Sequence, residues 1–155
     1  MFEVTCHDEY RWRRPRNEGH GMSAARNKKA LQTVFEELRK GNGKPFVDLW
    51  ADDFCWTIIG STAWSKTYNG KDSVRKDLMA PLFAKFATRY TNKATRFIAE
   101  DDYVVVECRG RVTTRSGQPY NNTYCYVCRM ADGRLKELTE YLDTELVTRA
   151  LGAPA

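Results

Sequence analysis

The stretch Tyr103-Val-Val-Val-Glu-Cys-Arg-Gly-Arg-Val-Thr-Thr114 alternates between two kinds of side chain, as a β-strand with one buried face does. One face carries Val104, Val106, Cys108, Gly110 and Val112, and the other carries Tyr103, Glu107, Arg109 and Arg111. Two more β-rich runs follow at 120–129 and 135–141, after the turn segments Arg115-Ser-Gly-Gln and Ala131-Asp-Gly. Turn residues between alternating runs are typical of an antiparallel meander. Its apolar face should lie against a core or line a pocket.

The residues before this meander show helical periodicity. Leu31, Val34, Phe35 and Leu38 recur at helical spacing, Ser23 or Asn27 can cap the start, and Gly41 ends the helix. We then expect a short helix at 46–50, a strand at 54–59, a loop at 60–70, a helix from about residue 72, a strand at 95–100 and a last helix at 144–151. Pro81 should kink or split the helix that contains it, and Asp143 or Thr144 should cap the last helix.

Helices followed by a meander predict an α+β domain. A curved, mostly antiparallel sheet that N-terminal helices wrap on its concave side makes a cone, a cystatin-like α+β barrel, and its open end forms a pocket. The 155 residues suffice for one core but not for two ordinary domains. We expect a single domain at 22–155, after a polar leader at 1–21 that is disordered or loosely docked.

Composition limits the possible partners and cofactors. The net charge of +5 is spread over the domain among acidic residues, which favours a solvated surface over a nucleic-acid site. No apolar stretch is long enough for a membrane span or a secretory signal, so the expected location is the cytoplasm. Cys125 and Cys128 would point to opposite faces of a strand, which is unsuitable for a shared metal or a redox pair. We expect reduced cysteines and neither metal nor cofactor.

Five segments together resemble the SnoaL-like branch of the nuclear transport factor two-like superfamily, which is related to ketosteroid isomerase and limonene epoxide hydrolase. They are Leu31-Gln-Thr-Val-Phe-Glu-Glu-Leu with Gly41-Asn, Leu49-Trp-Ala-Asp-Asp-Phe, Tyr68-Asn-Gly-Lys-Asp, Asp132-Gly-Arg-Leu and Glu140-Tyr-Leu-Asp143. The resemblance covers residues 27–151 and implies the cone fold. It does not specify a reaction, because this fold hosts isomerases, cyclases, hydrolases, dehydratases and non-enzymatic binders.

Neither related enzyme's catalytic set is retained. The resemblance places Thr57 or Ile58 where ketosteroid isomerase has its carboxylate base, and Val34 and Tyr126 where it has its oxyanion-binding pair. Limonene epoxide hydrolase needs Arg-x-Asp on a strand that here reads Cys108-Arg-Gly110, although Glu140 matches its last-strand acid.

Strand parity and the resemblance together place one carboxylate, Glu140, inside the pocket of the predicted cone. The other predicted pocket residues are Trp56, Asn122, Tyr124, Tyr126, Leu138 and Leu142. Desolvation by the aromatic residues should raise the pKa of Glu140, and hydrogen bonds from Tyr or Asn would oppose the rise. Glu140 is then a candidate acid or base, with the Tyr126 hydroxyl beside it. A structural anchor or a position at the rim are the alternatives.

The set suits a small ligand that is partly apolar and carries a carbonyl or hydroxyl group. Two classes of function stay open: a cofactor-free isomerase, cyclase or hydrolase, and a non-catalytic ligand-binding or protein-interaction module of the same fold. The outer sheet face lacks a predicted helix and should form a homodimer, with Glu107 and Arg109 paired across a two-fold axis.

Overall fold

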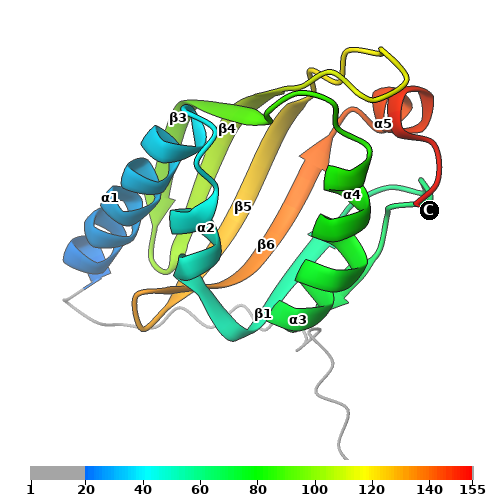
Figure 1. Cartoon of the computed structure of the whole chain (residues 1–155). Coiled ribbons are helices and arrows are strands. Elements are labelled where there is room, and N and C mark those ends of the chain that lie inside the picture. The colour runs from blue at the N-terminus through cyan, green and yellow to red at the C-terminus, as the bar shows by residue number, and fades with distance from the viewer. Residues whose placement is uncertain (1–19, 155) are drawn as a thin grey trace, which may run out of the picture.

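The computed structural model describes residues 20–154, with side chains from residue 24 onward. A six-stranded sheet has the order β2-β1-β6-β5-β4-β3. Its strands are β1 (Trp50–Ile58), β2 (Thr67–Asn69), β3 (Thr91–Glu100), β4 (Tyr103–Arg111), β5 (Thr123–Ala131) and β6 (Arg134–Leu142). β1 and β6 run parallel, and the other neighbours are antiparallel. The sheet is curved and does not close, because β2 and β3 remain its edges (Figure 1).

The helices cover one face of this sheet. They are α1 (His20–Leu38), α2 (Lys44–Leu49), α3 (Lys71–Ser73), the π-helical η1 (Val74–Met79), α4 (Ala80–Ala84) and α5 (Thr144–Leu151). Figure 1 shows α1, α2 and the α3–α4 segment in front of the sheet, with α5 at one end. The predicted α+β class with a curved sheet is therefore confirmed. None of the described helices is both long enough and apolar enough to cross a membrane.

The alternation in β4 determines which side of the sheet is buried. Val104 and Val106 are completely buried, whereas Tyr103 is 46% exposed. Antiparallel pairing carries the same division into β5, where Tyr124, Tyr126 and Cys128 lie on the inner face. The core therefore lies between the concave face of the sheet and the helices.

Several predicted boundaries shift. Trp50 begins β1 instead of ending the short helix, and β2 lies inside the predicted loop. α1 begins at His20, so residues 20 and 21 of the predicted leader are helical. The prediction for residues 1–19 lies outside the described residues. The first meander strand ends at Arg111, and Thr113 and Thr114 form only isolated bridges.

Pro81 splits the third helical segment, as predicted. It has no N–H for the regular hydrogen bond to the carbonyl four residues earlier, and its ring crowds that carbonyl. In the turn before it, Ala80 donates its N–H to the carbonyl of Arg75, a π-type bond. The segment is therefore α-helical, then π-helical, then α-helical, and it forms one wall of the cavity described next.

Candidate functional site

A cavity of about 220 Å³ lies between the concave face of the sheet and the helices. Its sheet side carries Trp56 and Ile58 from β1, Tyr124 and Tyr126 from β5, and Glu140 and Leu142 from β6. The helices contribute apolar side chains, including Phe46 and Phe83, and the latter is 45% exposed at the rim. Such a mainly apolar, concave space with a few polar groups is typical of a small-molecule site.

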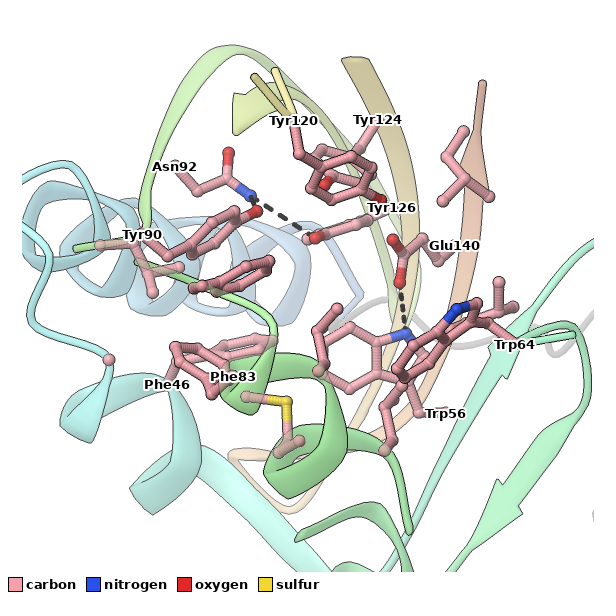
Figure 2. A pocket seen from close by; sticks show the side chains of 18 of the residues that line it. Phe46, Trp56, Trp64, Phe83, Tyr90, Asn92, Tyr120, Tyr124, Tyr126 and Glu140 are labelled. Atoms are coloured by element: carbon pink, nitrogen blue, oxygen red, sulfur yellow. Dashed lines mark hydrogen bonds between the residues drawn. The ribbon is translucent and has the colours of Figure 1, made fainter. Parts of the chain in front are cut away.

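Among the described residues, Glu140 is the one carboxylic acid that lines this cavity. Its side chain is only 6% exposed, because it shares the inner face of β6 with Leu138, two positions earlier. Parallel pairing of β1 with β6 brings Trp56 beside it, and the Trp56 indole Nε1 donates to Glu140 Oε2 at 2.7 Å (Figure 2). Within residues 20–154, Glu140 Oε1 accepts no hydrogen bond. One carboxylate oxygen is thus anchored, and the other remains available to a ligand.

Burial raises the pKa of Glu140 to about 7, and the hydrogen bond from Trp56 opposes the rise. The opposing donor was expected to be a tyrosine or an asparagine, whereas Trp56 was predicted as a pocket residue without this role. A carboxyl group with this pKa is present in both protonation states at neutral pH. It can therefore donate or accept a proton there.

A polar cluster around Asn92 lies in the same cavity. Asn92 Nδ2 donates to the hydroxyl oxygens of Tyr90 at 3.1 Å and Tyr126 at 3.5 Å (Figure 2). Its Oδ1 is buried and has no hydrogen-bond partner among the described residues. Burial raises the pKa of the Tyr90 and Tyr126 hydroxyls far above neutrality. These hydroxyls therefore stay neutral and can donate or accept hydrogen bonds.

Of the residues that the sequence placed in the pocket, five line the cavity: Trp56, Tyr124, Tyr126, Glu140 and Leu142. Asn122 and Leu138 do not, which corrects the prediction. Leu138 is buried core. Asn122 lies just before β5 and bonds the backbone of Asp143, donating to its carbonyl and accepting from its N–H, both at 3.1 Å. The inward amide thus fixes the β6–α5 junction, where Asp143 caps α5 by accepting from Leu146 N, as predicted.

Tyr90, Asn92 and Tyr120 also line the cavity, and they were not predicted as pocket residues. Gly110 is the one signal in the sequence that could have indicated the position of Tyr90. A Cβ at Gly110 would lie 2.7 Å from the Tyr90 hydroxyl and 2.9 Å from Tyr124 Cε2. A glycine on the inner face of a strand thus makes room for two aromatic rings.

No three His, Cys, Asp or Glu side chains of the described residues come together as a metal site would require. Cys55, Cys108, Cys125 and Cys128 form no disulfide. Cys128 is buried on the inner face while Cys125 is partly exposed on the outer face, in agreement with the predicted parity.

A family model for the SnoaL-like domain matches residues 31–138. An NTF2-like protein of unknown function from Burkholderia pseudomallei has 21% identity and a TM-score of 0.70, over 83% of this chain and 98% of that one. A Jannaschia protein named as a candidate SnoaL-like polyketide cyclase has 19% identity and a TM-score of 0.68, over 92% and 99%. TerC, co-crystallised with polyporic acid, has 18% identity and a TM-score of 0.69, over 83% and 99%. No curated protein matches the sequence. At these identities the likeness to solved structures concerns the fold.

Proposed function

The chain belongs to the SnoaL-like domain family, and from this premise we propose that its cavity binds a small, largely apolar organic molecule on which Glu140 acts as an acid or base. The observation that carries the proposal is the carboxyl group of Glu140, buried against Trp56, with one oxygen available to a ligand. The proposed chemistry is of the isomerase, cyclase or hydrolase type and uses no cofactor.

The lining of the cavity supports this proposal. Apolar and aromatic side chains would bind the body of the ligand by removing its surface from water. The Tyr126 hydroxyl, which lies beside Asn92, would donate to a carbonyl or hydroxyl oxygen of the ligand. Tyr126 itself stands opposite Glu140 in the β5–β6 pairing. One structural neighbour is named as a candidate polyketide cyclase, and another was co-crystallised with polyporic acid.

The acid of this site differs from those of the two related enzymes. Ile58, at one of the positions matched to the ketosteroid isomerase base, lies beside Glu140 across the β1–β6 pairing. A proton-transfer group is therefore supplied from β6 and not from β1. Its pKa near 7 suits reversible transfer at neutral pH, because both protonation states are then populated.

Solvent-deuterium exchange tests the proposal directly. 2-Tetralone is a two-ring ketone with acidic hydrogens next to its carbonyl, and proton NMR in D₂O follows their exchange. The wild type should accelerate exchange at pD 7–8, and Glu140→Gln should abolish the acceleration while keeping affinity within a few-fold. Glu100→Gln, a change at an exposed glutamate of β3, is the matched control. Binding without exchange would instead support the non-catalytic alternative, a ligand-binding or protein-interaction module.

We also propose a homodimer formed through the outer sheet face. Ile98, Val105 and Val127 stand in register across β3, β4 and β5, and no described helix covers them. Ile98 is 54% exposed. Glu107 is engaged within its own chain by Arg96 at 3.4 Å, so the predicted pairing with Arg109 of a second copy is not needed. The apolar row is the better basis for association.

A further inference from the structure

Among the described residues that line the cavity, the one side chain that can carry a charge near neutral pH is acidic. Glu140 can carry a negative charge, and no Lys, Arg or His of the described residues belongs to the lining. Arg89 lies near the rim of the cavity, because a Cβ added to the lining residue Gly41 would contact its side chain. The side chain of Arg89 is exposed to solvent. Water screens an exposed charge strongly. The described part of the interior therefore offers a ligand one negative group and no positive group.

The ionised form of Glu140 is poorly compensated. Within the described structure its single hydrogen bond comes from the neutral Trp56 indole. A buried carboxylate without a cationic partner is costly, because the protein supplies less solvation than water does. Its unpaired oxygen lies in a cavity large enough for a ligand, so a cation bound there would relieve this cost.

Aromatic rings surround the same space. Figure 2 shows Trp56, Trp64, Tyr124, Tyr126 and Phe46 around the cavity that Glu140 enters. The faces of such rings carry partial negative charge and attract ammonium groups. The rings and the carboxylate thus act in the same direction on the charge of a ligand.

We propose that this cavity selects its ligand by charge, and that its preferred ligands are molecules with an apolar body and a protonated amine that pairs with Glu140. The inference rests on the proposed function, since it names the substrate class of the same cavity. Neutral molecules of the same shape bind more weakly, and carboxylates bind most weakly because Glu140 repels them.

The other titratable groups that interact with the charge of Glu140 do not ionise near neutral pH. Burial raises the pKa of each of them: Tyr68 in β2, Tyr90 before β3, Cys108 in β4, and Tyr120, Tyr124 and Tyr126 in and before β5. The lining residues from α2, η1, α4 and α5 are apolar. Among the side chains that the structure describes, Glu140 alone therefore sets the pH dependence of binding between pH 5 and 8.

This dependence has a definite sign. An ammonium group favours the ionised carboxylate, so amine affinity rises as the pH increases from 5 to 8. At pH 6.5 much of Glu140 is protonated before binding, and the amine expels that proton. A neutral ligand that accepts a hydrogen bond from the protonated carboxyl shows the opposite trend.

Three probes of equal shape test the proposal: 2-naphthylmethylamine, 2-naphthylmethanol and 2-naphthoate. Isothermal titration calorimetry at pH 6.5 and 8 measures their affinities, and buffers of different ionisation heat report proton release. We expect the amine to bind at least about tenfold more tightly than the alcohol at pH 8, with net proton release at pH 6.5. Glu140→Gln should remove the preference and the proton release, and Glu100→Gln should retain both.

The outcomes separate the two proposals. If the wild type binds the alcohol as tightly as the amine or more tightly, selection by charge is overturned, but binding of a ligand in the cavity is still supported. This outcome does not depend on whether Glu140→Gln folds. An amine affinity that Glu140→Gln leaves unchanged overturns it as well, because Glu140 is then not the partner. If none of the three probes binds, both the ligand cavity and the inference fail.

Discussion

Glu140→Gln should stabilise the protein at alkaline pH, although it removes the proposed catalytic group. Gln is neutral at every pH and can still accept the hydrogen bond that Trp56 donates. The wild-type carboxyl has a pKa of about 7 in the folded protein against an ordinary value of 4.5. Between these two values the folded state binds a proton that the unfolded state has released, so stability falls as the pH rises. The ionisation of Glu140 leaves the stability of the wild type unaffected below pH 4.5 and reduces it by the full amount above pH 7.

The magnitude follows from the same two values. At 1.36 kcal/mol per pH unit, the ionised Glu140 costs the fold about 3 kcal/mol at pH 8 and less than 1 kcal/mol at pH 5. The variant should therefore gain about 2–3 kcal/mol on the wild type between pH 5 and pH 8. Other carboxyl groups also titrate, but their effects cancel when variant and wild type are compared at each pH.

Urea unfolding at pH 5, 6, 7 and 8, followed by circular dichroism, measures this difference. Glu100→Gln, at an exposed position of β3, should show a difference near zero at every pH. A constant difference for Glu140→Gln across the series would mean that folding does not raise the pKa of Glu140. The reasoning from desolvation would then be refuted, and with it the basis for acid or base chemistry at this residue.

Trp56→Phe removes the donor to the charged carboxylate, so the pKa of Glu140 should rise by about 1 pH unit or more, as infrared spectroscopy of the carboxyl band would show. Gly110→Ala should cost about 1–3 kcal/mol in urea unfolding by overpacking. Gly43→Ala, where a Cβ meets nothing within 4 Å, should stay within about 0.5 kcal/mol. Asn122→Leu should cost about 1–3 kcal/mol through unpaired backbone groups and leave calorimetric ligand affinity unchanged. Light scattering at micromolar concentration should give twice 17.9 kDa, and a monomeric mass would contradict the dimer.

Strand parity predicted the inner face of β4, because this strand keeps a regular period of two. It also predicted the inward position of Glu140, because β6 keeps that period from Leu138 to Glu140. Parity cannot be carried along the whole of β3, because its register shifts between Ala94 and Arg96. Counted back from the predicted strand at 95–100, Asn92 falls on the outer face. The register shift turns Asn92 inward, and no residue type in the sequence indicates that shift.

The donor to Glu140 could not be predicted for a different reason. The bond between Trp56 and Glu140 depends on the parallel register of β1 and β6, which a single sequence does not specify. Asn122 was misplaced because parity gives the face of a strand but not the distance along it. Its amide reaches the backbone of Asp143 at the end of the sheet, beyond the cavity.

The parallel pairing of β1 and β6 also determines when the site forms during folding. Trp56 and Glu140 are 84 positions apart, and their strands meet only after the chain between them has closed a long loop. Contacts of such long sequence separation are slow to form. The acid therefore acquires its buried surroundings in the same event that joins the two halves of the sheet, and a partly folded chain holds an ordinary, solvated glutamate.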